Sequence, residues 1–390
     1  MNDKKFYRFI PYIKGKTSKQ AHANLPKNSD GKTTYEEEHG RQGFFGKVSH
    51  LYHINPPTGF TKIEGEFKPE LINTNKLALK NQNDNWELPI YFLENSNLRL
   101  GISKISKKMH FYLKETLNDL VYFIHNGQGK FQTSYGILPY KVGDYIVIPK
   151  GTPHKIIPET ENNFFLLIES REEIQIPDRG LLGPTALFDP AMIETPEPNP
   201  LSDGGKGTET IVRHKRMDKY SDYYYNFDIG RNVIGWKGDV TPWKINIHDF
   251  RPIMSHRYHL PPSAHTTLLT NSFVVCSFVP RLFEREKGVL KIPFYHSNVE
   301  YDEVIFYHAG NFFSRDNIDA GMVTFHPAGF LHGPHPKALQ KMLKQDNEMT
   351  DEYAVMVDSR NPLNLTKEAQ EVLDEHYYKS WLGANFEGEE

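Results

Sequence analysis

The 390-residue chain contains almost no cysteine and no long uninterrupted apolar run. Cys276 stands alone, so an intrachain disulfide is excluded and the sequence predicts a reducing, cytoplasmic compartment. No apolar run reaches the roughly 18 residues that a membrane-spanning helix needs, and the N-terminus lacks the apolar core of a secretory signal. The sequence therefore predicts neither a disulfide scaffold nor a membrane protein.

Strong charge of one sign is also absent. The net charge of −3 at pH 7 gives no electrostatic reason to expect nucleic acid or a membrane surface as a partner. The chain has no glycine-rich phosphate loop before a helix, no basic aromatic stripe and no serine–histidine–acid arrangement. These absences point away from nucleotide binding, nucleic-acid binding and serine-hydrolase chemistry.

Short strand-like runs are what the sequence has in abundance. From Trp86 onward, runs rich in Val, Ile, Tyr and Phe alternate with turn residues, and such runs resume from Tyr223. This spacing predicts an all-β sandwich or barrel architecture. Before Trp86 the chain is polar and broken by Gly, Pro and Asn, which predicts a β-rich arm.

The change of amino-acid composition between the two strand-rich parts predicts the domain organisation. Residues 174–208 are loaded with Pro, Gly and acidic residues and predict a linker or covering loop. We therefore expect an arm and a first barrel over residues 1–173 and a second barrel over residues 209–390. Good helix formers follow Thr366, a candidate N-cap, which predicts one C-terminal helix.

An internal repeat supports the two-barrel reading. GDYIVIPKGTPH (residues 143–154) and GMVTFHPAGFLH (residues 321–332) share a glycine, a proline, a second glycine and a histidine at identical spacing. The glycines and the proline suit tight turns around a strand. The pattern resembles the second signature of the cupin superfamily, and the resemblance implies a bicupin, two double-stranded β-helix (jelly-roll) barrels in tandem.

The second half also resembles the first cupin signature. His296 and Asn298 are followed by Glu303, and Gly310 comes seven positions after that glutamate. With His332, two imidazoles and a carboxylate match the facial triad that binds non-haem Fe(II) and leaves positions free for substrate and O₂. No thiolate is available, which argues against a structural zinc site. The alternative is that these are ordinary buried or rim histidines and a solvated acid.

Two neighbouring acids compete with Glu303 for the carboxylate position. Asp302 is adjacent to it and Glu300 lies in the preceding turn, but only Glu303 has the signature spacing to the glycine. The first half has Asp119 and Gly127 at a slightly different spacing and no histidine pair before them. We therefore expect a metal-free first barrel, in which the repeat histidine His154 is structural.

Several segments resemble the homogentisate 1,2-dioxygenase family, itself a bicupin, and together they span most of the chain. They are HSNVEYDEVIFYHAGNFFSRDN, FHPAGFLHGPHP, GWKGDVTPWKINIHDF, YEEEHGRQGFFGKVSHLYHINPPTGF and LDEHYYKSW. The resemblance implies that His296, Glu303 and His332 bind Fe(II), that His326 is a second catalytic-site histidine, and that Asn298 lies near the substrate hydroxyls. It also implies a homo-oligomer, a trimer or a hexamer.

The reaction that the resemblance implies is oxidative ring opening in aromatic amino-acid (tyrosine and phenylalanine) breakdown. Both atoms of O₂ enter a hydroquinone-type aromatic acid, and homogentisate would yield maleylacetoacetate. The partners are then a small aromatic substrate and O₂. Rival hypotheses are a dioxygenase for gentisate or an aminophenol, a non-catalytic ligand-binding bicupin, and a metal-dependent cupin isomerase.

The chain departs from the family pattern at the predicted substrate pocket. Lys237 stands where the family has its catalytic-base histidine, and it could act as a base only if its pKa were lowered. Phe294 and Phe312 replace tyrosines that bind the substrate carboxylate, which removes two hydroxyl donors. Arg315 matches a family lysine and could hold a carboxylate bidentately. His335 is a further candidate for the pocket lining.

Overall fold

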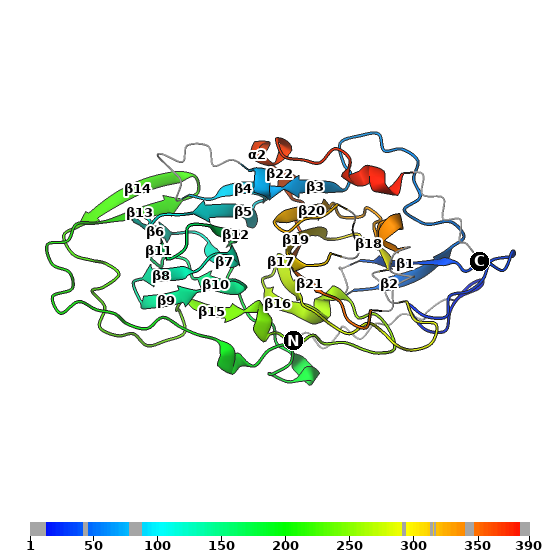
Figure 1. The fold of residues 1–390 in the computed structure, drawn as a ribbon, viewed down its shortest axis with the longest axis horizontal. Coiled ribbons are helices and arrows are strands. Elements are labelled where there is room, and N and C mark those ends of the chain that lie inside the picture. Colours follow the sequence, from blue (N-terminus) through cyan, green and yellow to red (C-terminus); the bar gives the residue numbers. More distant parts are fainter. Residues whose placement is uncertain are drawn as a thin grey trace.

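The computed structural model describes residues 13–41, 46–77, 88–290, 294–312, 315, 317–339 and 347–382. Within these ranges the regular secondary structure is almost wholly β-strand, with a few short helical turns. Figure 1 shows two strand-built units side by side along the long axis of the molecule. The predicted all-β, bicupin fold is confirmed.

The N-terminal barrel is made of two sheets. The seven-stranded sheet has the order β15 (Trp243–Asn246), β10 (Asp144–Ile148), β7 (Asp119–Asn126), β12 (Asn163–Ser170), β5 (Leu98–Ile105), β4 (Ile90–Glu94), β22 (Asn364–Leu365). The six-stranded sheet has the order β14 (Lys219–Tyr225), β13 (Thr210–Arg216), β6 (Tyr112–Glu115), β11 (His154–Pro158), β8 (Gly129–Thr133), β9 (Gly136–Tyr140).

The C-terminal barrel is also made of two sheets. The larger has the order β16 (Thr266–Leu269), β17 (Phe273–Phe278), β21 (Glu352–Ser359), β19 (Asp302–Gly310), β20 (Met322–His326), β3 (Glu70–Asn73). The smaller has the order β18 (Tyr295–Asn298), β1 (Tyr35–Gly40), β2 (Val48–His53).

Strand pairing crosses the predicted domain boundaries at residues 173 and 208. The arm strands β1, β2 and β3 all join sheets of the C-terminal barrel, and β22 joins the N-terminal one. Strands β13, β14 and β15 lie beyond residue 208, yet they extend the sheets of the N-terminal barrel. Each half thus covers edge strands of the other, which leaves fewer unpaired backbone groups exposed.

The segment between the boundaries and the C-terminal tail contain only short helical turns. Residues 174–208 include 3₁₀ turns at Gly180–Leu182 and Pro190–Met192. The predicted C-terminal helix is present but short, at Lys367–Gln370, and the Thr366 side chain caps it by accepting from the Ala369 amide. A 3₁₀ turn at Tyr377–Trp381 follows, and it buries the Trp381 side chain against the C-terminal barrel.

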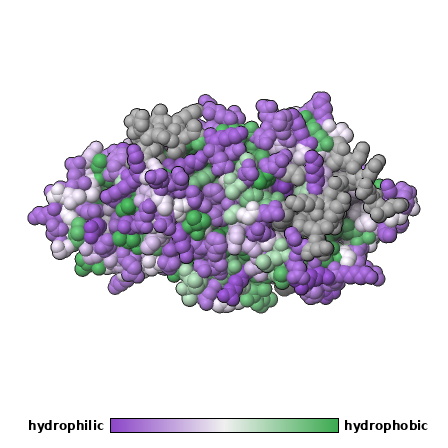
Figure 2. Space-filling view, in the orientation of Figure 1, coloured by the Kyte–Doolittle hydropathy of each residue, from purple (hydrophilic) through white to green (hydrophobic). Residues whose placement is uncertain are grey.

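One hydrophobic core runs through both barrels. Phe123 of the N-terminal barrel and Phe306 of the C-terminal barrel belong to the same buried cluster, with ring centroids 6.3 Å apart. Outside this core, the face shown in Figure 2 is mostly hydrophilic, with hydrophobic residues scattered over it. Among the residues described, no helix has the length and apolar character that crossing a membrane requires.

Replacing Phe306 by alanine should lower the stability of both barrels together. Phe306 is 1% exposed and also packs its ring against Phe164, 6.1 Å away between centroids. Loss of a buried phenylalanine ring typically costs about 3–5 kcal/mol of unfolding free energy. Denaturant unfolding followed by fluorescence should show one transition at lower denaturant. The control Leu181→Ala removes an exposed side chain and should shift nothing.

Candidate metal centre

Three predicted ligands converge inside the C-terminal barrel. His296 lies on β18, Glu303 on β19, and His332 follows the turn after β20. The Nε2 atoms of both histidines lie 3.4 Å from the same carboxylate oxygen, Oε2 of Glu303. One ligand atom from each residue can be chosen so that all lie within 4.8 Å of one another. This arrangement has the size of a mononuclear metal site.

Backbone contacts set the positions of the two histidines. The amide of His296 donates to the His332 carbonyl at 2.9 Å, and the His332 amide donates back at 3.0 Å. Nδ1 of His296 lies 3.1 Å from the Phe294 carbonyl and Nδ1 of His332 lies 2.9 Å from the Phe330 carbonyl. A carbonyl only accepts, so each Nδ1 carries the proton and each Nε2 keeps its lone pair. Both lone pairs face Glu303.

The donor set fits a divalent metal ion. Nε2 of His332 is buried and has no hydrogen-bond partner, an arrangement that costs free energy unless a further group meets that atom. Burial disfavours ionisation of Glu303, but the neighbouring histidines His332, His296 and His326 hold its pKa well below the usual range. Burial and the neighbouring His296 lower the pKa of His332. A carboxylate with neutral imidazoles is the protonation state that metal binding requires.

His326 orients the glutamate rather than facing the pocket. Its Nδ1 lies 2.8 Å from Oε1 of Glu303, and its Nε2 lies 3.0 Å from the hydroxyl of Tyr377. The side chain is completely buried, and burial, with the nearby His332, lowers its pKa to about 3. The two Glu303 oxygens therefore face different partners: Oε1 faces His326, and Oε2 faces the two candidate ligand histidines.

Asp302 has a structural role that differs from that of Glu303, because it binds backbone amides. Its Oδ1 accepts from the Ala328 amide and its Oδ2 from the Leu363 amide, both at 2.7 Å. In the first barrel Asp119 does the same, accepting from the amides of Lys150 and Ile174 at 2.9 and 3.0 Å. Asp119 thus corresponds to Asp302 rather than to the ligand.

This correspondence shows what the first barrel has in place of the ligands. The residue after Asp119 is Leu120, so leucine stands where the second barrel has Glu303. His154 pairs with Leu113 across the sheet, as His332 pairs with His296. The repeat histidine His154 is fully buried, and its Nε2 lies 3.0 Å from the Tyr122 hydroxyl. Two leucines therefore occupy the positions of two candidate ligands, and His154 makes a structural contact.

A pocket opens beside the triad and includes two arginines. Its lining contains His296 and Glu303 together with Arg281, Arg315 and Glu352. Phe278, Ile305 and Met356 add apolar walls to this pocket.

Arg315 was predicted from the sequence, whereas Arg281 and Glu352 were not. Their segments carry no motif that marks a site. Burial raises the pKa of Glu352 to about 7, although the arginines oppose the shift.

His259 is another pocket residue whose place sequence reasoning missed. It follows Tyr258 in the HRYHL segment, which carries no recognisable site motif. The side chain is buried, and its Nδ1 lies 3.1 Å from Oε1 of Glu284 and 3.0 Å from Nη2 of Arg281. It therefore belongs to a network that holds Arg281 at the pocket.

The other predicted substrate residues lie around the centre in different environments. Phe294 stacks on the His22 ring at 4.0 Å, and Phe312 packs against Tyr307 at 4.9 Å. Asn298 is buried on β18, where its carbonyl accepts from the Gly329 amide. His335 is buried against Trp381, and its Nδ1 lies 2.9 Å from the Ser380 hydroxyl.

Lys237 is the one predicted site residue that the chain places elsewhere. Its side chain is exposed. The neighbouring Trp236 donates to the Pro196 carbonyl and packs against Tyr135, in the turn between β8 and β9 of the N-terminal barrel. The described residues that line the pocket beside the triad do not include Lys237.

Comparison with protein families gives two matches that together cover most of the chain. A model described as homogentisate 1,2-dioxygenase N-terminal matches residues 94–247, and one described as homogentisate 1,2-dioxygenase C-terminal matches residues 258–387. A Saccharolobus solfataricus protein named "Putative dioxygenase" is 31% identical over 383 residues, which cover 94% of this chain and 97% of that protein.

Relatives named homogentisate 1,2-dioxygenase are more distant. The Rhizobium johnstonii protein is 26% identical over 276 residues, which cover 64% of this chain and 58% of the relative. The Nitrobacter hamburgensis protein is 23% identical over 298 residues, which cover 72% of this chain and 64% of the relative. These alignments therefore leave more than a third of either relative unmatched.

Solved structures include cupin proteins with low overall similarity. A cupin 2 conserved barrel domain protein from Leptotrichia buccalis is 12% identical with a TM-score of 0.35, covering 77% of this chain and 99% of that chain. A cupin-2 domain protein from Shewanella frigidimarina is 22% identical with a TM-score of 0.21, covering 25% and 89%. At TM-scores this low, these structures give no information about the site.

Replacing His332 by alanine should remove the ion bound at this centre, because the Nε2 atom that faces Glu303 is lost. The matched control is His154→Ala, at the same position of the repeat in the first barrel, where no ligand pair surrounds the ring. After anaerobic reconstitution with Fe(II) and dialysis, iron analysis should show one ion fewer per chain for His332→Ala and no loss for His154→Ala. Equal iron content in both variants would place the metal elsewhere.

Proposed function

The chain belongs to the homogentisate 1,2-dioxygenase family, and on that premise we propose that it is a mononuclear non-haem Fe(II) dioxygenase that opens a hydroquinone-type aromatic ring with both atoms of O₂. The observation that carries the proposal is the convergence of the His296 and His332 Nε2 atoms on one Glu303 oxygen, at 3.4 Å each. Two imidazoles and one carboxylate leave several positions of a six-coordinate ion open.

Ferrous iron is the metal that suits this donor set and this reaction class. A site of two nitrogens and one oxygen without thiolate matches the facial triad of Fe(II) oxygenases. Iron held there would supply the redox chemistry that lets O₂ react with an electron-rich ring. The protein contributes the fixed tautomers of the two histidines, the carboxylate oriented by His326, and a pocket with apolar walls.

We propose homogentisate as the substrate, bound through its carboxylate. Arg281 and Arg315 both line the pocket, and guanidinium groups bind carboxylates through two parallel hydrogen bonds. They would take over the task of the tyrosines that Phe294 and Phe312 replace. The apolar walls formed by Phe278, Ile305 and Met356 suit the aromatic ring.

Proton transfer during the reaction needs a group whose pKa lies near neutrality. Glu352 lines the pocket and has a pKa raised by burial to about 7, so we assign it as the pocket's proton carrier. His326 is a positioning residue, because both its ring nitrogens are engaged. Lys237 could act as the base only on the centre of another copy of the chain, in the homo-oligomer that the family resemblance implies.

A direct test is oxygen uptake by the anaerobically Fe(II)-loaded protein. We expect uptake with homogentisate, accompanied by the absorbance of the ring-opened product, and little with catechol, which lacks a carboxylate. The panel includes gentisate and an aminophenol acid, because Phe294 and Phe312 alter the family's carboxylate site. Preference for one of these would change the substrate but keep the reaction class. No uptake with any hydroquinone acid would contradict the dioxygenase proposal.

Replacing Arg315 by methionine should selectively impair acidic substrates. A hydrogen bond to a charged group contributes about 1.5–3 kcal/mol, so kcat/KM for homogentisate should fall roughly 10- to 150-fold. Unsubstituted hydroquinone has no carboxylate, and its slower turnover should change little. The control Arg216→Met alters an exposed arginine of the N-terminal barrel and should leave both rates unchanged. An equal loss for both substrates would assign Arg315 to the fold instead.

A further inference from the structure

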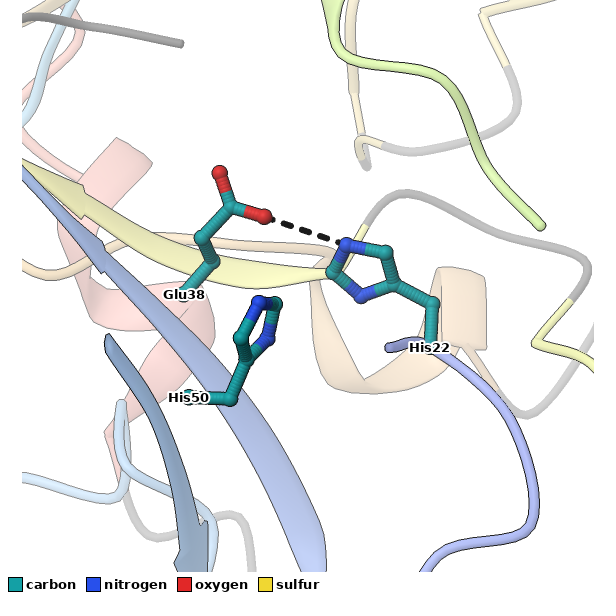
Figure 3. Close-up of side chains that lie close together, drawn as sticks. All are labelled: His22, Glu38 and His50. Atoms are coloured by element: carbon teal, nitrogen blue, oxygen red, sulfur yellow. Dashed lines mark hydrogen bonds and ion pairs between the residues drawn. The ribbon is translucent and has the colours of Figure 1, made fainter. Parts of the chain in front are cut away.

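A second cluster of histidine and glutamate side chains lies in the N-terminal arm. Figure 3 shows His22, Glu38 and His50 directed toward one another, and one ligand atom from each lies within 4.8 Å of the others. Nε2 of His22 is 3.1 Å from Oε2 of Glu38. Glu36 adds a second carboxylate, with Oε2 3.1 Å from Nδ1 of His22 and Oε1 3.2 Å from Nδ1 of His50.

The three-stranded sheet places this cluster beside the first centre. In the register of the sheet, Glu38 of β1 lies opposite His296 of β18 on one side and opposite His50 of β2 on the other. Residues directly across neighbouring strands share a face, so these three form one row on the sheet surface. Neighbouring strands lie about 4.8 Å apart, which puts His50 about 10 Å from His296 in the plane of the sheet. The two clusters are therefore neighbours with separate ligands.

We propose that His22, Glu38 and His50, together with Glu36, form a second divalent-metal site that fastens the N-terminal arm to the C-terminal barrel. Two imidazoles with carboxylates and no thiolate suit Zn²⁺, Mn²⁺ or Fe²⁺. The side chains of His22 and Glu36 are almost fully buried, and that of Glu38 is 14% exposed. Two clustered carboxylates in such a place favour a doubly charged partner.

His50 is the residue that distinguishes a metal site from a simple ion-pair network. A network needs only His22 between the two glutamates, and both of its ring nitrogens are already 3.1 Å from carboxylate oxygens. His50 extends that network only through the 3.2 Å approach of its Nδ1 to Oε1 of Glu36, and this buried nitrogen has no hydrogen-bond partner of acceptable geometry. An ion held between His22, Glu38 and His50 would be coordinated by this nitrogen.

The proposed site also contacts a residue that positions a ligand of the first centre. The His22 ring stacks on Phe294 at 4.0 Å between centroids and 17° between planes. The carbonyl of Phe294 accepts the Nδ1 proton of His296, the first ligand of the proposed iron site. An ion that fixes His22 would therefore fix the residue that orients His296. The role is structural, because none of the four proposed ligands lines the pocket beside the triad.

The test counts Zn²⁺ ions bound to metal-free protein by equilibrium dialysis and elemental analysis. We expect two per chain in the natural protein, one in His50→Gln, one in Glu38→Gln, one in His332→Ala, and none in His332→Ala combined with His50→Gln. The control His53→Gln removes a histidine of the same strand that faces Glu37, on the opposite side of the sheet, and should keep two.

A second readout keeps the proposal testable if a variant folds poorly. In the His332→Ala protein, Zn²⁺ should raise the melting temperature, because an ion that binds only the folded state stabilises it. The added substitution His50→Gln should abolish that rise. A single ion in the natural protein that is lost in His332→Ala, or two ions that persist in both His50→Gln and Glu38→Gln, would overturn the proposal. Neither result depends on dioxygenase activity, so the failure of one proposal leaves the other standing.

Discussion

The buried carboxylate of Glu303 is the constraint on which the C-terminal barrel depends. A charged group in a barrel interior is costly unless its oxygens are fully occupied by partners. Here His326 takes one oxygen and two Nε2 atoms face the other. The contact is held from outside as well, because Tyr377, from the turn near the C-terminus, fixes His326. Strands, turns and tail thus meet at one side chain.

The two barrels share a scaffold and differ in what it holds. Asp119 and Asp302 each bind two backbone amides that close the barrel around the repeat turn. Leu113 and Leu120 stand where the second barrel has two of the proposed ligands, and they lie in the apolar core of the first barrel. The aspartate belongs to the architecture of both barrels, whereas the glutamate is present in only one, at the proposed metal site.

Strand exchange ties the arm to the proposed chemistry. β1 pairs in parallel with β18, the strand that carries His296, and β3 closes the edge of the sheet beside β20. The N-terminal segment therefore forms part of the wall of the C-terminal barrel and brings His22 to Phe294. Sequence order hides this, because the paired strands are separated by more than two hundred residues.

The sequence by itself determined the all-β class and the two barrels, and it singled out the three residues of the proposed triad. Strand-like alternation and the glycine–proline–histidine repeat are local patterns, and the spacing from Glu303 to Gly310 selects the ligand over Asp302 without any coordinates. The C-terminal helix also followed from local signals, though the tail turns to bury Trp381 and the helix ends early.

Only the tertiary structure decided which half of the chain completes which barrel. It also brought Arg281, His259 and Glu352 to the pocket and His22 to His50, and it placed Lys237 beside the other barrel. Pairing between distant strands depends on register and on which edges are left open, and neither is encoded in a short window of residues. Ligand spacing is local and can be read from the chain, whereas the surroundings of the ligands form only when distant strands meet.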